Sequence, residues 1–201
     1  MKISDKMQEN NNLQSEFVCQ ACNDAQLWDS FRQGDTNALA NIYTTYFPSL
    51  FQYGVKLSAD TDFVRDCIHD LIEDLFHYRK SVNDTNNIQY YMCRSLKNKI
   101  LRHRKNQYPT DTINGNSSLF EVAFDEQIQE QETIRHRRCC IRRALKQLPQ
   151  RQKEVMYLCY IFDFNHREIA QLMKINYQAV RNVHHKAIKK LREKHAENKI
   201  F

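Results

Sequence analysis

The chain has 201 residues, of which 41% are hydrophobic, so it is long enough to bury one large core or two small ones. Only 3 Gly and 3 Pro occur, and apolar residues recur at spacings of three and four, which predicts an all-α protein. No secretory signal is present, and no apolar run approaches the roughly 18 residues of a membrane span. We therefore expect a cytoplasmic protein without membrane insertion.

No catalytic or metal-binding motif stands out. A Gly-rich phosphate loop, a His-Glu-x-x-His motif and a nucleophile elbow are all missing, so we expect neither enzymatic activity nor a cofactor. The seven cysteines are scattered, which is typical of reduced thiols in a cytosolic core. Cys19 with Cys22, and Cys139 and Cys140 with His136, lack the paired spacing of a structural zinc site, so we predict no metal site.

The net charge of +6 hides an alternation of acidic and basic blocks. Residues 24–84 have a net charge of −5, residues 90–105 of +6, residues 106–133 of −6, and residues 134–201 of +12. Blocks of this kind indicate a nucleic-acid partner for the basic segments and a second partner for the acidic ones.

The first part of the chain predicts a helical domain over residues 24–105, after a disordered extension over residues 1–23. A break at Gly34, with Asp35 as the cap of the following helix, and a break or kink at Pro48 divide its first helices. A further helix is predicted from about Thr61 to Tyr78. Its inward residues are Phe63, Val64, Cys67, Ile68, Leu71, Ile72, Leu75 and Phe76.

The outer face of this helix is mainly acidic. It carries Arg65, Asp66, His69, Asp70, Glu73 and Asp74. The face is either an ordinary solvated surface or a docking surface for a basic partner, and the pattern leaves both open.

A basic amphipathic helix is predicted over Tyr90–Lys105, after a polar loop over Asn83–Gln89. Its outer side carries Arg94, Lys97, Asn98, Arg102, Arg104 and Lys105, and two tyrosines stand at its start. Cations and aromatic rings together favour binding of single-stranded or melted nucleic acid, because rings stack on bases and cations neutralise phosphates.

Residues 106–133 read as an acidic flexible linker, because a segment this long and polar is unusual inside one domain. The second helical domain then covers residues 134–201. It begins with a basic helix over 134–148, and Pro149 fits the first position of the next helix. That helix directs Val155, Met156, Leu158, Cys159 and Phe162 toward the core.

Residues 165–191 specify a helix-turn-helix. Asn165 and Glu168 form a capping box, Asn176 caps the second helix, and Ala170 allows close approach of the two helix axes. Lys174 lies where such turns usually have Gly at positive φ. The second helix buries Val180, Val183, Ala187 and Leu191. Its outward residues are Arg181, Asn182, His185, Lys189 and Arg192, a basic and amide-bearing face that fits the major groove of DNA.

Two sets of residues, in this order, resemble the extracytoplasmic-function (ECF) class of bacterial RNA polymerase sigma factors. The first set is Phe31-Arg32-Gln33-Gly34-Asp35, Ala38, Tyr43, Tyr46, Phe47-Pro48, Leu50, Asp66 to Leu71, and Tyr90-Tyr91 through Arg94 to Lys99. The second set is Leu148-Pro149, Glu168-Ile169-Ala170, Val180-Arg181-Asn182 and Ala187 to Arg192. Together they cover most of the chain.

The resemblance implies a promoter-specificity subunit with a region-two-like and a region-four-like domain. It implies polymerase binding by Asp66, His69, Asp70 and Glu73. It implies minus-ten DNA contacts by Asn83, Asn86, Arg94, Lys97, Asn98 and Arg102. It implies minus-thirty-five contacts by Tyr177, Gln178, Arg181, Asn182, His185 and Lys189. The expected partners are core RNA polymerase, promoter DNA and an anti-sigma factor.

Two other functions fit parts of the pattern. A stand-alone helix-turn-helix transcriptional regulator would use the same C-terminal domain, and its N-terminal domain would sense a signal or dimerise. It would bind a pseudo-palindromic duplex without polymerase. An adaptor that binds only protein would not contact DNA at all.

Overall fold

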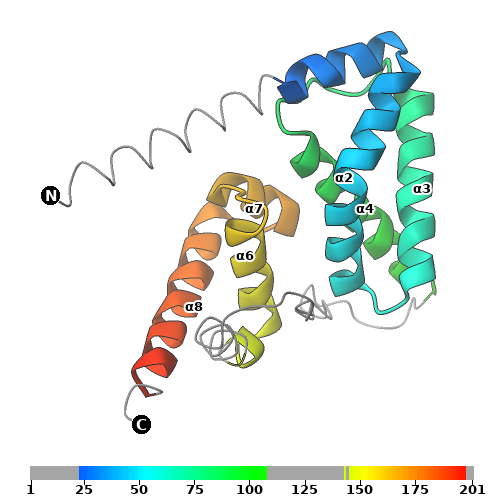
Figure 1. Cartoon of the computed structure of the whole chain (residues 1–201). Coiled ribbons are helices and arrows are strands. Elements are labelled where there is room, and N and C mark those ends of the chain that lie inside the picture. Colours follow the sequence, from blue (N-terminus) through cyan, green and yellow to red (C-terminus); the bar gives the residue numbers. More distant parts are fainter. Residues whose placement is uncertain (1–22, 108–142, 144, 198–201) are drawn as a thin grey trace, which may run out of the picture. The chain divides into compact units, whose positions relative to one another are not determined.

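The structure, a computed structural model, describes residues 23–107, 143 and 145–197. A helix covers residues 23–33. It is followed by α2 (Thr36–Leu57), α3 (Thr61–Tyr78), α4 (Ile88–Gln107), α6 (Gln150–Tyr160), α7 (His166–Met173) and α8 (Tyr177–Glu197) (Figure 1). No strand occurs among the described residues, and the predicted all-α fold is confirmed. Most of the predicted N-terminal extension and of the acidic linker lies outside these residues. So do all five residues of the two weak metal motifs: Cys19, Cys22, His136, Cys139 and Cys140.

Two compact units make up the chain: residues 1–53 with 62–99, and residues 54–61 with 100–201. The division into domains at 24–105 and 134–201 stays a prediction. Within the part of the chain that the structure describes, no helix is both long and apolar enough to cross a membrane.

The first unit is a bundle of helices around a large apolar core. The largest fully buried side chains of this core are Trp28, Phe31, Ile42, Leu50, Tyr53, Ile68, Ile88, Met92 and Leu96. They come from the helix over 23–33 and from α2, α3 and α4, so each helix contributes one apolar face. Burial of each large side chain stabilises the fold by about 1.5 to 3 kcal/mol, which makes this core the main source of its stability.

The helix α2 continues through Pro48, so of the two predicted alternatives, a break or a kink, the break does not occur. Proline removes one amide donor and disfavours a helix interior by about 3 kcal/mol. Ile42, Tyr46 and Leu50 lie on either side of it at helical spacing, and all are buried. Keeping one register across Pro48 buries this whole face, which outweighs the cost of the proline. The predicted break at Gly34 is confirmed, and Gly34 has a positive φ of 102°.

Phe76 also differs from its predicted inward position. The helix α3 begins and ends at the predicted residues, and it buries Val64, Cys67, Ile68, Leu71 and Leu75. Phe76, however, is 43% exposed, and the guanidinium of Arg79 lies 4.9 Å from the centre of its ring. The Arg79 side chain thus covers part of an aromatic face that the core does not bury.

The second unit holds the predicted helix-turn-helix. Helices α6 and α8 pack side by side and bury Val155, Leu158, Val180 and Ala187 (Figure 1). Pro149 is the cap that precedes α6 and not its first residue, with φ −56° and ψ 148°. Because this extended ψ is not helical, no helix runs through Pro149 into α6, and α6 begins at Gln150. The predicted basic helix over 134–148 lies mostly outside the described residues.

Candidate nucleic-acid interface

The start of α7 is held by the predicted capping box. The side-chain oxygen of Asn165 accepts hydrogen bonds from the amides of Arg167 at 2.9 Å and Glu168 at 3.0 Å. In return, the Glu168 carboxylate accepts from the Asn165 amide at 2.8 Å. These bonds satisfy amides that have no partner inside the helix, so the first residue of the helix-turn-helix is well defined.

The turn between α7 and α8 contains a strained residue. Lys174 adopts the left-handed conformation, φ 53° and ψ 46°, in which its amide donates to the carbonyls of Ala170 and Gln171. The Ile175 amide donates to the Ala170 carbonyl at 3.0 Å. Asn176 then caps α8, because its side-chain oxygen accepts from the Ala179 amide at 2.6 Å. The predicted turn is confirmed, with a lysine where glycine would fit without strain.

All six residues predicted to contact the upstream promoter element lie on the exposed side of α8. They are Tyr177, Gln178, Arg181, Asn182, His185 and Lys189. The opposite side of the helix buries Val180 and Ala187 completely. Residues spaced by four align along a helix, so the tyrosine, the arginine, the histidine and Lys189 form one row.

Two side-chain pairs order the first turns of this face. The Gln178 amide nitrogen donates to the Asn182 side-chain oxygen at 3.2 Å. The Arg181 guanidinium lies 6.0 Å from the centre of the Tyr177 ring. Guanidinium and amide groups can bond to guanine and adenine edges, so the face combines base-reading groups with positive charge.

The basic side of α4 differs from the prediction at one position. Arg94 and Arg102 are exposed and Asn98 is half-buried, and their spacing of four places them on one face. Lys97, expected beside them, is buried with 8% of its surface exposed. The Tyr91 ring packs 5.0 Å from the Trp28 ring, and burial raises the pKa of its hydroxyl. In this conformation the face offers two arginines and an amide, and Lys97 offers little to a nucleic acid.

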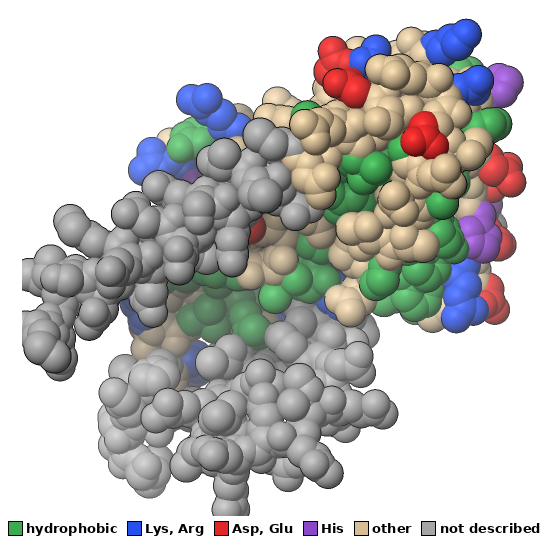
Figure 2. Space-filling view, turned by 45° about the horizontal axis from the view of Figure 1, so that its top comes forward, with side chains coloured by type: hydrophobic (Ala, Val, Ile, Leu, Met, Phe, Trp, Pro, Cys, Tyr) green, Lys and Arg blue, Asp and Glu red, His purple; other side chains and the backbone are tan. Residues whose placement is uncertain are grey.

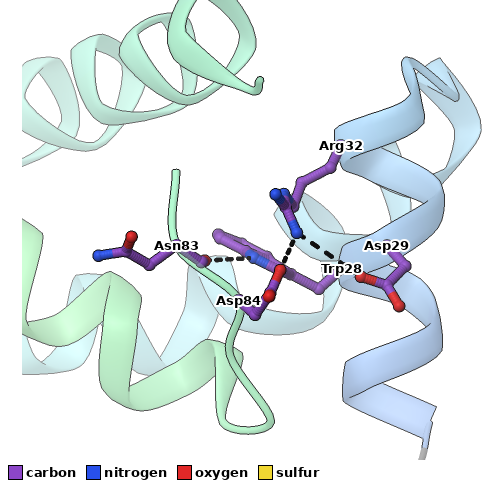
Figure 3. Close-up of polar contacts among 5 residues, drawn as sticks. All are labelled: Trp28, Asp29, Arg32, Asn83 and Asp84. Atoms are coloured by element: carbon purple, nitrogen blue, oxygen red, sulfur yellow. Dashed lines mark hydrogen bonds and ion pairs between the residues drawn. The ribbon is translucent and has the colours of Figure 1, made fainter. Parts of the chain in front are cut away.

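The loop between α3 and α4 is attached to the first helix. The indole nitrogen of Trp28 donates to the carbonyl oxygen of Asn83 at 3.0 Å, and Arg32 forms an ion pair with Asp84 (Figure 3). The Asn83 side chain points away from Trp28 (Figure 3). The side chains of Asn83 and Asn86 are exposed. The backbone of the loop is therefore held while its amide side chains face outward.

The predicted docking residues Asp66, His69, Asp70 and Glu73 are all exposed on α3. In Figure 1, α3 forms the right-hand edge of the first unit. The space-filling view in Figure 2 shows acidic and histidine side chains along this edge. A row of half-buried rings on α2, Tyr43, Phe47 and Phe51, lies beside them. The Tyr43 hydroxyl lies 3.4 Å from His69 Nε2, and the Arg65 guanidinium lies 5.3 Å from the centre of the Phe51 ring. The face is thus acidic with an aromatic border.

An ion pair joins this acidic face to α4. The ammonium group of Lys99 lies 2.9 Å from a carboxylate oxygen of Asp74 and 3.5 Å from one of Asp70. Burial lowers the pKa of Lys99, but the two carboxylates outweigh that effect and raise it above its ordinary value of 10.5. Asp70 is therefore already paired with a cation, whereas Asp66 and Glu73 lie on the same exposed face outside this ion pair.

Residues 139–191 match the family model described as sigma-70, region 4. The chain carries a sigma-70 region 4 domain. Its fold is similar to those of two solved structures. It is similar to the structure of CnrH in complex with the cytosolic domain of CnrY, at 16% identity and a TM-score of 0.51, over 85% of this chain and 95% of that one.

A second similar structure is that of the sigma factor RpoE in complex with the anti-sigma factor NepR from Bartonella quintana. It is 16% identical, with a TM-score of 0.53, and the match covers 76% of this chain and 92% of that one. No curated protein matches the chain. The likeness to RpoE shows that the chain has the fold of a sigma factor, and the region 4 match links the sequence of the helix-turn-helix to the sigma-70 family.

In the region 4 domain, local sequence signals were sufficient to find the exposed face of α8. In the rest of this sigma factor fold they missed two features. The aromatic row on α2 has a visible signal, because Tyr43, Phe47 and Phe51 recur at a spacing of four. Lys99 had no such signal, since its partners Asp70 and Asp74 lie on another helix.

Proposed function

We propose that the protein is an RNA polymerase sigma factor of the ECF class, which directs core RNA polymerase to specific promoters. The observation that carries this proposal is the exposed face of α8, with its guanidinium, amide and ammonium groups, within a sigma-70 region 4 domain. This function is one of binding and not of catalysis, as in the rest of the sigma family. A sigma factor acts on chromosomal DNA, so we place the protein in the cytoplasm.

Recognition of the minus-thirty-five element is assigned to α8. Arg181 and Asn182 would read base edges in the major groove, with Gln178 in support. Tyr177, His185 and Lys189 would contact the sugar-phosphate backbone and set the register of the helix. Each good base contact contributes about 1 to 3 kcal/mol of discrimination, whereas phosphate contacts add affinity that salt weakens.

Contact with the minus-ten element is assigned to the loop after α3 and to α4. The exposed amides of Asn83 and Asn86 would bond to unpaired bases, because amides can both donate and accept. Arg94, Asn98 and Arg102 would follow the backbone of the melted strand along one face. Lys97 belongs to the same proposal, but its burial requires a side-chain movement before it can reach a phosphate.

Docking to core RNA polymerase is assigned to the acidic face of α3, through Asp66, His69, Asp70 and Glu73. Exposed carboxylates attract a basic partner and accelerate its encounter. The aromatic row on α2 supports this assignment, because half-buried rings beside charges are typical of the centre of an interface. The acidic segment 106–133 would connect the two DNA-binding parts.

An anti-sigma factor is proposed as a further partner. Of the two similar structures, RpoE from Bartonella quintana was solved in complex with the anti-sigma factor NepR, and CnrH in complex with the cytosolic domain of CnrY. A partner of this kind would have to cover a DNA-binding or polymerase-binding surface of this chain in order to inhibit it.

The decisive experiment is transcription in vitro with core RNA polymerase and genomic DNA, with start sites mapped in the presence and absence of this protein. New start sites that share two upstream elements are expected. A variant with Arg181→Ala and Asn182→Ala provides the control, since it should bind polymerase and lose most of these sites. Absence of new start sites with the parent protein would refute the proposal. Binding to a palindromic duplex without polymerase would instead favour the stand-alone regulator.

A further inference from the structure

Three metal-ligand side chains meet where helices α6, α7 and α8 come together. Cys159 lies near the end of α6, His166 is the first residue of α7, and His184 lies in the middle of α8. One ligand atom from each of the three lies within 4.8 Å of the other two. The centres of the two imidazole rings are 5.0 Å apart, and all three residues are half-buried.

The backbone around this cluster is well defined. The short segment between α6 and α7 is held by a hydrogen bond from the Phe164 amide to the Leu158 carbonyl at 3.0 Å. The capping box of Asn165 immediately precedes His166. His166 and Cys159 are therefore presented by ordered backbone on each side of a tight connection, and His184 faces them from α8.

The distances suit a small transition-metal ion. Bonds from zinc to sulfur are about 2.3 Å and to imidazole nitrogen about 2.0 to 2.1 Å, so tetrahedral ligand atoms lie roughly 3.3 to 3.6 Å apart. The three ligand atoms lie within 4.8 Å of one another, so shifts of about 1 Å, of the size that small side-chain rotations produce, would bring them to this separation. One thiolate and two imidazoles also form a donor set that divalent zinc and cobalt prefer.

We propose that Cys159, His166 and His184 form a binding site for a divalent transition-metal ion of the zinc type, with water as the fourth ligand. The thiol of Cys159 releases its proton to solvent when the metal binds, and both imidazoles bind in their neutral form. No electron is transferred. The proposal does not depend on the sigma factor function, because it concerns metal binding by the second unit alone.

The electrostatics of the three groups are compatible with this role. Burial, together with the neighbouring His166 and His185, lowers the pKa of His184, so its imidazole is neutral at pH 7 and can act as a ligand. Burial and the nearby carboxylate of Asp163 raise the pKa of Cys159 to about 11, so the metal must displace a proton. The negative charge of Asp163 favours a cation nearby.

Tyr160 contacts the cluster through His184. Its hydroxyl lies 3.2 Å from Nε2 of His184. If that bond is kept, Nδ1 of His184 is the nitrogen that faces the metal, and the hydroxyl orients the ring from outside, as is common for imidazole ligands. Cys159, His166 and His184 are widely and unevenly spaced along the chain, which explains why no sequence motif predicts the site.

A metal at this position would join α6 to both helices of the helix-turn-helix. Because the three ligands meet only in the folded chain, the ion would bind the native state in preference to the unfolded state and raise the melting temperature. It would also restrain the angle between α7 and α8. The competing interpretation is a packed cluster of two imidazoles and a tyrosine that needs no ion, and it predicts no effect of metal.

The test uses the full-length, reduced protein, freed of metal by a chelator and titrated with Co²⁺. Visible d–d bands report tetrahedral geometry, and a near-ultraviolet charge-transfer band reports a thiolate ligand. We expect both signals to saturate at one equivalent and to disappear when Zn²⁺ displaces the cobalt. Cys159→Ser should abolish the charge-transfer band. His166→Asn and His184→Asn should each weaken the affinity by at least about tenfold.

Two control variants locate the signal. The double change Cys19→Ser and Cys22→Ser, and the single change His77→Asn on α3, should leave both bands unchanged. A charge-transfer band that persists in Cys159→Ser, or a parent protein without a cobalt spectrum, would overturn the proposal. Because a substitution at a half-buried site can impair folding, X-ray absorption of the zinc-loaded parent gives an independent measurement. One sulfur and two imidazole nitrogens are expected, and absence of the sulfur would refute the site.

Discussion

The carboxylate of Asp24 accepts a hydrogen bond from the hydroxyl of Tyr46 at 2.6 Å, and both side chains are buried. Its second oxygen accepts from the backbone amide of Ile88, the first residue of α4, at 3.1 Å. A negative charge at the start of a helix is favourable, because the free amides there carry partial positive charge. One carboxylate thus joins the first helix, α2 and α4.

The change Asp24→Ala should therefore lower the free energy of unfolding by about 2 to 3 kcal/mol, since it leaves a buried hydroxyl and a buried amide without this acceptor. Equilibrium unfolding in urea measures the effect. Asp29→Ala is the matched control, because Asp29 is exposed and its contact with Arg32 is 4.0 Å long. That variant should differ from the parent by less than about 0.5 kcal/mol. Equal losses in the two variants would contradict the structural role of Asp24.

The ion pair of Lys99 with Asp74 should make a small contribution to stability that does not vary near neutral pH. The pKa of Lys99 is raised in the folded state, so its contribution is complete below the ordinary value of 10.5 and is lost as the pH rises through the folded pKa. We expect Lys99→Met to cost up to about 1 kcal/mol at pH 6 and the same at pH 9. Urea unfolding at the two pH values tests this, and a cost that differs between them would argue against the ion pair.

Replacement of the strained residue in the turn should stabilise the region 4 domain. Lys174 has φ 53°, which costs a residue with a Cβ about 1 to 2 kcal/mol, whereas glycine adopts it freely but loses more chain entropy. Lys174→Gly should raise the free energy of unfolding by up to about 1 kcal/mol. Lys186→Gly on the exposed side of α8 is the control and should lower it by about 1 kcal/mol. Thermal and urea unfolding distinguish the two signs, and a loss of stability in Lys174→Gly would be inconsistent with strain at this turn.

Arg181→Ala should reduce discrimination at the upstream element by roughly 10- to 100-fold, because a base contact contributes about 1 to 3 kcal/mol. Lys186→Ala removes the same charge from α8 outside the proposed reading set. It should weaken binding to matched and scrambled elements alike. Transcription from promoters with matched and scrambled elements, at one salt concentration, measures the ratio. An unchanged ratio in Arg181→Ala would exclude base reading by this residue.

Charge reversal on α3 tests the docking surface. The double variant Asp66→Lys and Glu73→Lys places two cations on the exposed face, and it should abolish co-purification with core RNA polymerase through like-charge repulsion. Asp29→Lys, outside that face, should co-purify as the parent does. Circular dichroism should show unchanged helicity in both variants, because all three positions are exposed. Retained co-purification of the double variant would count against docking through α3.

Local sequence signals located most of the helices and the exposed polar face of α8. Capping depends on side chains within three residues of a helix end, so Asn165, Glu168 and Asn176 could be assigned from the sequence, and their hydrogen bonds are present. The positive φ at Lys174 followed from its place in the turn. The local penalty of a proline favours a break at Pro48, but this penalty does not include the long-range burial of Ile42, Tyr46 and Leu50, which keeps α2 continuous.

The sequence alone thus determined the helical class, the helix-turn-helix and the polar face of α8, because periodicity and capping act over a few neighbouring residues. Only the tertiary structure decided that Lys97 is buried and Phe76 is exposed, and that Asp24 meets Tyr46 and Ile88. It also brought Cys159, His166 and His184 together. These relationships depend on how helices distant in the chain pack against one another, and the spacing of residues within one helix contains no information about that packing.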